Sequence, residues 1–171
     1  DESLQTSEPG VFACGNALHI HDLADYASEE GEIAGASAAR FALAMREGDG
    51  EEVAREIAST RAREDCGAAE RDFAPVVTGE GVRYVVPQRI SMRGMGCGDA
   101  RAEDSVILSF RPSRAVKGPK VIVEAILRNG ATRAVVSRKL MAAVPAEMVR
   151  LKVPVGDLRD ADEVRVRLEE R

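Results

Sequence analysis

The most concentrated set of potential metal ligands in this chain is one short acidic stretch that holds both of its histidines. His19 and His21 are followed closely by Asp22 and Asp25. Imidazole and carboxylate groups together can bind a divalent transition metal, and His21 and Asp25 would share a helix face if one helix included both. However, no H-x-x-x-H spacing and no nearby cysteine partner completes a recognised motif. We therefore expect no metal site.

The three cysteines do not form a redox or disulfide pattern. Cys14, Cys66 and Cys97 are odd in number and far apart, and no C-x-x-C pair exists. This usage is typical of a reducing cytoplasm rather than of a disulfide-stabilised secreted domain. Cys14 is expected to act as a small buried hydrophobic residue. Cys97 lies among glycines that could form an anion-binding nest, but a loop between strands is the simpler interpretation.

A turn between an apolar run and a helical segment is the second candidate for chemistry. Val11–Cys14 has the length of a short buried strand, Gly15-Asn16 breaks it, and helical character starts near Asp22. This order of elements brings backbone N–H groups to a ligand at a helix N-terminus. Asn16 could equally cap the helix or support its own turn, because a short polar side chain after glycine does both.

The residues of this segment resemble a known family. The pattern T-x-x-P-G-V-F-A-x-G-(D/N), followed by E-G-x-x-A-G-x-x-A-A, spans roughly residues 6 to 40. It resembles the second flavin-binding motif of the pyridine nucleotide-disulfide oxidoreductases, relatives of thioredoxin reductase. The form with Asn16 and HIHDLAD is most similar to the FAD/NAD(P)-dependent subunits that accompany anaerobic glycerol-3-phosphate dehydrogenases. The resemblance does not extend to the other three quarters of the chain.

The resemblance implies a role for particular residues. Asn16 would hydrogen-bond the ribityl chain of FAD, although many family members have aspartate at this position. The helix start near Asp22 and Leu23 would present N–H groups to the flavin pyrimidine oxygen. Without the resemblance, an ordinary capped helix explains the same residues. The cofactor-binding positions expected from it are Gly15, Asn16, His21, Asp22 and Leu23, and no catalytic residue is expected in this chain.

In that family the motif lies near the end of the catalytic core, so the chain is expected to be the C-terminal part of an FAD-dependent NAD(P)H oxidoreductase. The sequence contains no strand–GxGxxG–helix unit and no redox dithiol. We therefore expect it to lack a complete active site and to need the family's N-terminal FAD/NAD(P) domains or a dehydrogenase subunit as partner. FAD, and NAD(P)H as co-substrate, belong to that parent protein. Two alternatives remain open: a non-catalytic interaction or homodimerisation module, and a small protein that uses the turn for another ligand.

Charge divides the chain into two parts. Residues 1–72 carry 17 acidic and 6 basic side chains, whereas residues 73–171 carry 12 acidic and 18 basic ones. This asymmetry, together with a change of hydrophobic period, predicts domains at 1–65 and 66–171. Aromatic residues make up only 4% of the chain, so the basic part has no stacking platform, and nucleic-acid binding is not expected. No apolar run approaches the ~20 residues of a membrane span.

The first part is expected to be helical. Apolar residues from Ala24 to Leu43 form a loose helical face, with Gly31 as a possible break, and Glu51–Arg63 is a second helical candidate.

The second part is expected to be antiparallel β-structure. Alternating apolar and polar residues predict strands at Arg83–Val86, Ser105–Phe110, Lys120–Leu127, Thr132–Lys139, Met148–Val153 and Glu163–Glu169. Asn129-Gly130 between two β-branched runs is a strong hairpin signal. Arg111, Arg114, Lys117 and Lys120 form a basic run that we expect to be a solvated loop or a partner contact. The predicted fold class is α+β, in which a strand–turn–helix remnant of an FAD-binding Rossmann-like domain precedes a small sandwich or open barrel.

Overall fold

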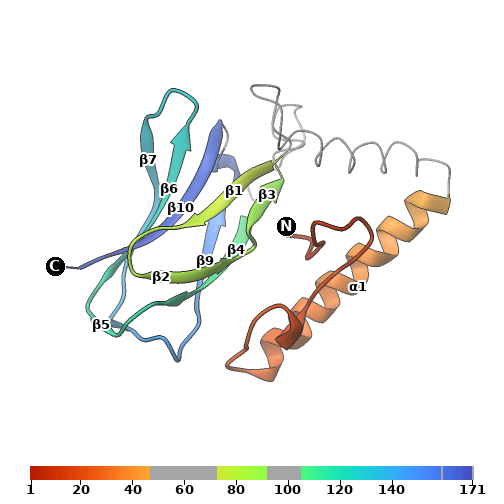
Figure 1. Cartoon of the computed structure of the whole chain (residues 1–171), viewed down its shortest axis with the longest axis horizontal. Helices are drawn as coiled ribbons and strands as arrows, with labels where there is room; N and C mark the ends of the chain where they lie inside the picture. Colours follow the sequence, from red (N-terminus) through yellow and green to blue (C-terminus); the bar gives the residue numbers. More distant parts are fainter. Residues whose placement is uncertain (47–72, 92–104, 159, 171) are drawn as a thin grey trace. The chain divides into compact units, whose positions relative to one another are not determined.

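The chain folds as an α+β protein with one long helix and antiparallel sheets, in agreement with the predicted class (Figure 1). The computed structural model describes residues 1–46, 73–91, 105–158 and 160–170. It divides into two compact units, one formed almost wholly by residues 3–71 and the other by residues 72–171. The predicted boundary at residues 65 and 66 and the predicted helix Glu51–Arg63 lie outside the described residues. Among the described helices, none combines the length and the apolar character needed to cross a membrane.

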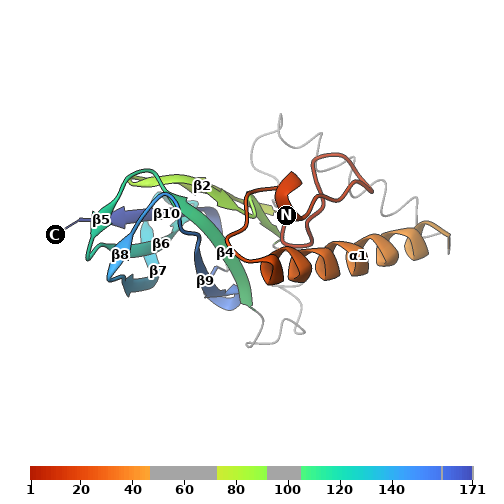
Figure 2. The same cartoon turned by 90° about the horizontal axis from the view of Figure 1, so that it is seen from below.

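The described residues of the first unit form a looped segment, a short 3-10 helix and an α-helix. The 3-10 helix η1 spans Gly15–Ala17, and α1 spans Ala24–Arg46. Alanine, the residue with the highest helix propensity, occurs throughout α1. The helix runs without interruption through Gly31 and Gly35, so the break considered at Gly31 does not occur. Residues 1–23 lie beside α1 and contribute the only bridge of this unit's described residues (Figure 2).

One face of α1 is covered, and it has helical spacing. Its members recur every three or four residues and are mostly small: Ala27, Glu30, Ala34, Ser37 and Phe41. Phe12 meets Phe41 edge to face with ring centroids 6.3 Å apart. Gly10 lies so close to the Phe41 ring that a Cβ added there would be 2.8 Å from it, and its φ of +75° also requires glycine. The looped segment therefore packs on this helix face through close backbone approach.

The strand predicted over Val11–Cys14 is wrong. The structure contains a single antiparallel bridge, Gln5 to Phe12, in its place. Val11 is 52% exposed, whereas the prediction required a run buried on both faces. A run of four apolar residues becomes a strand only where neighbouring strands accept its hydrogen bonds, and the described residues of this unit contain no such strand.

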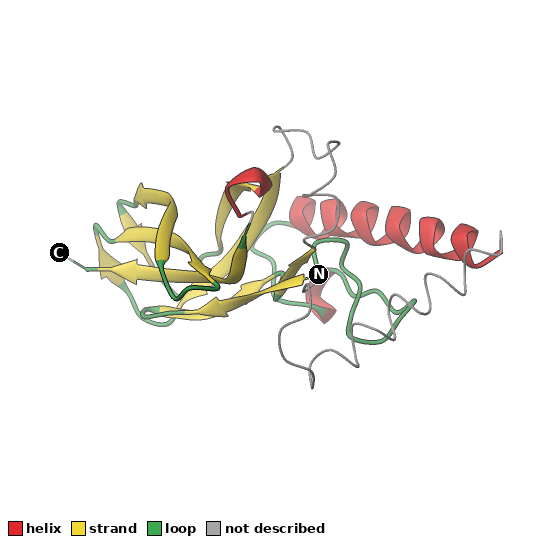
Figure 3. Ribbon diagram, turned by 90° about the horizontal axis from the view of Figure 1, so that it is seen from above, coloured by secondary structure: helices red, strands yellow, loops and turns green. Residues whose placement is uncertain are grey.

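The second unit is a sandwich of two sheets. One sheet has five strands in the order β3-β1-β10-β6-β7, and the other has three in the order β2-β4-β9. The bounds are β1 Phe73–Thr78, β2 Val82–Val86, β3 Arg89–Ser91, β4 Ser105–Pro112, β5 Val116–Lys117, β6 Lys120–Leu127, β7 Thr132–Lys139, β8 Ala142–Ala143, β9 Val149–Pro154 and β10 Ala161–Glu169. β5 and β8 form a separate two-stranded pair, and the 3-10 helix η2 spans Val155–Leu158. Figure 3 shows the strands of the two layers in yellow.

All six strands predicted from alternation are present, and β6 and β7 have the predicted limits. β2 ends at Val86, immediately before Pro87, as the prediction required. The four strands without an individual prediction are β1, β3, β5 and β8. Strand direction differs in one place, because β1 pairs with β10 in parallel, with Val76 opposite Val164. Alternation specifies which face is buried, but it carries no information about the direction of the neighbouring strand.

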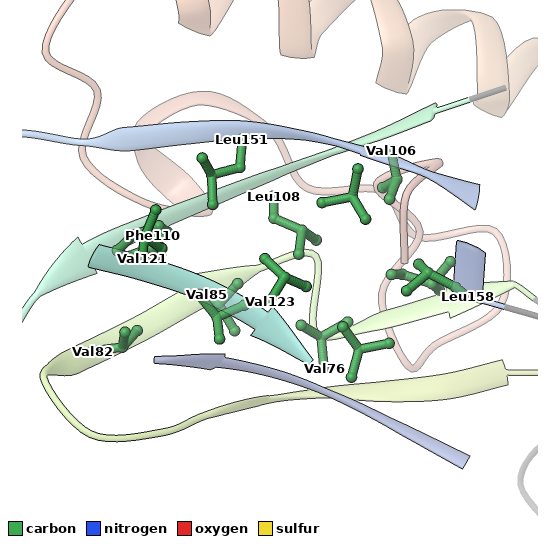
Figure 4. Packing of buried hydrophobic residues seen from close by; sticks show 14 of the residues in the cluster. Val76, Val82, Val85, Val106, Leu108, Phe110, Val121, Val123, Leu151 and Leu158 are labelled. Atoms are coloured by element: carbon green, nitrogen blue, oxygen red, sulfur yellow. The ribbon is translucent and has the colours of Figure 1, made fainter. Parts of the chain in front are cut away.

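The core lies between the two sheets and is almost entirely aliphatic (Figure 4). Val106, Leu108 and Phe110 of β4 point inward, as predicted, and so do Val164, Val166 and Leu168 of β10. Leu151 of β9 and Val123 of β6 complete the centre of this packing. On the outside, Glu124 accepts a hydrogen bond of 2.9 Å from Arg167 Nε. This bond raises the pKa of the Arg167 guanidinium further above its already high value.

Two tight turns in this unit depend on glycine for different reasons. Gly130, in the predicted Asn-Gly hairpin, has φ +78°, and nothing lies within 4 Å of an added Cβ. Gly81, between β1 and β2, has φ +77°, and an added Cβ would be 2.9 Å from Leu168 Cβ in the core. Only the second turn therefore combines a left-handed backbone with close packing.

These two glycines provide a matched test of backbone conformation against packing. Gly130→Ala should lower the free energy of unfolding by about 1–2 kcal/mol, the usual penalty of a left-handed non-glycine residue. Gly81→Ala should lower it by roughly 1–3 kcal/mol more, because it also overpacks the core at Leu168. Urea denaturation of both variants measures the difference. Equal midpoints for the two variants would show that the approach to Leu168 adds no strain.

Candidate functional site

The candidate site lies where residues 15–23 fold back onto the first turns of α1. Gly15 begins η1 with φ +61°, a conformation that favours glycine. Its Cα faces Ala27 of the helix, since an added Cβ would lie 4.0 Å from Ala27 Cβ. The segment then passes His19 and His21 and reaches the helix at Ala24.

Glu30 is the centre of this arrangement. Its Oε2 accepts a hydrogen bond of 2.9 Å from the backbone N–H of Gly15. The same carboxylate meets both imidazoles, with Oε1 2.7 Å from His19 Nε2 and Oε2 2.9 Å from His21 Nε2. The side chains of His19, His21 and Glu30 are only 4%, 5% and 14% exposed. One helix carboxylate therefore holds the turn and both histidines in place.

The two imidazole rings are also close to each other, with centroids 4.3 Å apart. Only Ile20 separates His19 and His21 in the sequence, and both rings contact the same carboxylate. Their Nε2 atoms and a carboxylate oxygen of Glu30 all lie within 4.8 Å of one another. Within the described residues, this is the one group of three histidine, cysteine or acidic side chains close enough to share an ion.

The five positions expected to contact flavin lie together at this end of α1. Asn16, Asp22 and Leu23 are exposed, and Leu23 is 53% accessible. Asp22 and Leu23 immediately precede Ala24, so the helix starts two residues later than expected. The Gly15 N–H and the His21 imidazole are already engaged by Glu30. Of the predicted side chains, those of Asn16, Asp22 and Leu23 face solvent and remain accessible to a ligand.

Asn16 also has a local structural role. Its Oδ1 accepts a hydrogen bond of 3.2 Å from the backbone N–H of His21. This is the turn-supporting role considered for Asn16 from the sequence. The side chain is nevertheless exposed, so it can hold the turn and still offer its amide group to a ligand.

The potential metal ligands identified from sequence are only partly brought together. His19 and His21 meet, but Asp22 and Asp25 are not part of the cluster, and Glu30 supplies the carboxylate. Local spacing could not identify Glu30, because it is 9 residues from His21 and 11 from His19. The feature that could have identified Glu30 is its position on the covered face of α1, where every other member is small or apolar. An acidic residue on a buried helix face needs partners.

The other candidates have no catalytic arrangement. Cys14 is a free, partly buried cysteine, and Cys66 and Cys97 lie outside the described residues. The basic run is not a uniformly solvated loop, because Arg111 is buried in β4. Its guanidinium donates to Tyr84 Oη and to the carbonyl oxygen of Pro145, both at 3.1 Å. Arg114 is exposed and pairs with Glu170.

Comparisons with known proteins do not assign this chain to a family. No family model matches the chain, and neither the curated proteins nor the solved structures contain a significant match to it. The function therefore has to be argued from the residues and their geometry.

Proposed function

We propose that this chain forms the C-terminal part of an FAD-dependent NAD(P)H oxidoreductase. In this proposal, residues 15–23 and the start of α1 form one wall of the flavin site, and the β-sandwich contacts a subunit or partner. The observation that carries the proposal is the exposed turn at the N-terminus of α1. Asn16, Asp22 and Leu23 lie there together on a backbone that Glu30 holds in place.

The physical argument concerns what this turn offers a ligand. A helix N-terminus carries unsatisfied N–H groups and a partial positive charge, which favour an electron-rich oxygen such as a flavin carbonyl. Asn16 adds a hydrogen-bonding amide beside it, suited to the hydroxyl groups of a ribityl chain. Leu23 adds apolar surface on which a flat ring can pack. These three features match the chemistry of a flavin better than that of a small anion, which would need no apolar surface.

The remainder of the flavin site must come from other residues. The sequence has no GxGxxG turn for the pyrophosphate. The helix α1 also has room for a neighbour, because only Ala34 and Ser37 are buried in it. Ile33, Leu43 and Met45 are 44–48% exposed. We propose that the FAD/NAD(P) domains of the family, or a dehydrogenase subunit, cover this surface, in a cytoplasmic protein whose cysteines stay reduced.

The alternative is a non-catalytic interaction or dimerisation module. The exposed apolar side chains of the first unit favour it, including Ile20 at 68% and Val11 at 52%, because such residues are typical of surfaces that associate. The gene sequence distinguishes the two possibilities. A reading frame that encodes a strand–GxGxxG–helix unit in frame before Asp1 supports the flavoprotein, and a frame without one contradicts it.

Asn16 provides the biochemical test in the whole flavoprotein. Asn16→Ala should weaken FAD binding roughly 2- to 13-fold, the equivalent of one net hydrogen bond of ~0.5–1.5 kcal/mol. Asn16→Asp keeps an acceptor both for the turn and for the ribityl chain, so it should retain near-normal affinity. Flavin fluorescence titration of the apoprotein measures both variants. Unchanged affinity in Asn16→Ala would remove this turn from the flavin site.

A further inference from the structure

In the proposed flavin site the cluster of His19, His21 and Glu30 only supports the backbone, although its three side chains are largely buried and lie in contact with one another. Its three side chains are largely buried, whereas Asn16, Asp22 and Leu23 are exposed. Two of them come from the segment before α1, and the third comes from the second turn of the helix. The cluster therefore joins two parts of the unit at one point.

We propose that His19, His21 and Glu30 bind a divalent transition metal ion, with Zn²⁺ as the best chemical match. Two imidazole nitrogens and one carboxylate oxygen form a common three-residue protein ligand set for zinc. With neutral imidazoles and one carboxylate, the site would compensate one of the two positive charges of the ion. The fourth position would be open to water or to a group from outside the chain, as it is in zinc sites with three protein ligands.

The geometry supports a shared ion. The ligand atoms of a tetrahedral zinc ion, with bonds of about 2.0–2.2 Å, lie a little over 3 Å apart. His19 Nε2 lies 2.7 Å from Glu30 Oε1, and His21 Nε2 lies 2.9 Å from the other oxygen, Oε2, so the carboxylate has to move back by about half an ångström and to turn one oxygen toward the ion. Glutamate has the side-chain torsions to do this. An ion needs three ligand atoms close together, and one such atom from each of the three side chains lies within 4.8 Å of the other two.

The surroundings of the ligands support the same conclusion. Gly15 donates its backbone N–H to Glu30 Oε2, the type of outer contact that orients a ligating carboxylate. The backbone of His21 is held by the hydrogen bond from its N–H to Asn16 Oδ1. The ligands are thus positioned before an ion binds, so that little conformational entropy is lost on binding. The competing explanation is a purely hydrogen-bonded cluster, in which both imidazoles donate Nε2–H to the carboxylate.

Calorimetry separates these explanations. Untagged protein, stripped with a chelator and kept reduced, should bind one Zn²⁺ per chain. His19→Ala, His21→Ala and Glu30→Gln should each weaken binding by more than roughly 100-fold, which exceeds the 10- to 100-fold typical of losing an outer contact. The matched controls are Asp25→Asn and Glu32→Gln, exposed acidic residues of the same helix, which should bind normally. Cys14→Ser should also bind normally, because its thiol is not part of the cluster.

A second measurement uses the unmodified chain, so misfolding of a variant cannot affect its result. The chain has only two histidines, so its NMR spectrum contains only two sets of imidazole resonances. Both should shift together when Zn²⁺ is added and should reach saturation at one equivalent. Resonances that do not move, or zinc binding that survives in Glu30→Gln but is lost in the cysteine variant, would overturn the proposal. The metal proposal and the flavin proposal fail independently, since no flavin is used in either experiment.

Discussion

Replacing Phe110 with alanine is expected to lower the free energy of unfolding of the β-sandwich by about 3–5 kcal/mol, the range for deleting a buried aromatic ring. Phe110 is completely buried in β4, the central strand of the three-stranded sheet. Among the described residues, the buried core cluster contains no other phenylalanine and consists otherwise of valine, leucine, isoleucine and alanine. The neighbouring aliphatic side chains are smaller than the deleted ring, so the site should relax only partly.

Ile107 of the same strand is the control, because it faces outward and is 45% exposed. Ile107→Ala should change the stability by only about 1 kcal/mol or less, as surface substitutions usually do. Urea denaturation, followed by circular dichroism with a constant m-value, compares the two variants. Since a domain of this size is stable by only about 5–15 kcal/mol, Phe110→Ala should be close to unfolding at 37 °C. Similar midpoints for both variants would contradict the assignment of the core.

Replacing Glu30 with alanine should have the largest effect in the first unit, even without any metal. The change removes the acceptor of the Gly15 N–H and of two buried imidazoles at once. Leaving a buried polar group without its partner costs about 1–3 kcal/mol. We therefore expect residues 15–21 to open more readily from α1, while the helix itself persists.

Amide hydrogen exchange of Gly15, measured with a chelator present, reports this opening. Its exchange should accelerate roughly 5- to 150-fold, which is the same ~1–3 kcal/mol expressed as a local opening equilibrium. Glu32→Ala is the control, because Glu32 is exposed on the same helix and takes no part in the cluster. Equal Gly15 exchange in the two variants would show that Glu30 does not hold the turn.

The sandwich was the part of the fold most accessible from sequence. Inward-facing residues at every second position, such as Val106 and Leu108, mark a strand with one buried face. The Asn-Gly dipeptide fixed the β6–β7 hairpin, because it readily adopts the positive φ that Gly130 shows. The short strands β3, β5 and β8 have only two or three residues, too few to show a period. They exist because neighbouring strands supply their hydrogen bonds.

The first unit was less predictable for the same physical reason. Val11–Cys14 has the composition of a strand, but hydrogen-bonding partners decide whether a strand forms, and only Gln5 bridges to Phe12 here. The continuity of α1 through Gly31 was equally undecided, since two glycines weaken a helix without dictating where it ends. The positions of Gly15, Asn16, Asp22 and Leu23 beside a helix start were anticipated. Their contact with flavin stays a prediction.

By itself, the sequence determined the α+β class, six strands of the sandwich and the turn that precedes α1. These features follow from periodicity and turn chemistry, which act between residues close in the chain. Only the tertiary structure decided that Glu30, rather than Asp22 or Asp25, meets His19 and His21. Adjacent helix positions differ by about 100° in direction, so the packing of residues 1–23 on one face of α1 selects which carboxylate turns inward. That selection depends on long-range packing, which no local spacing of residues records.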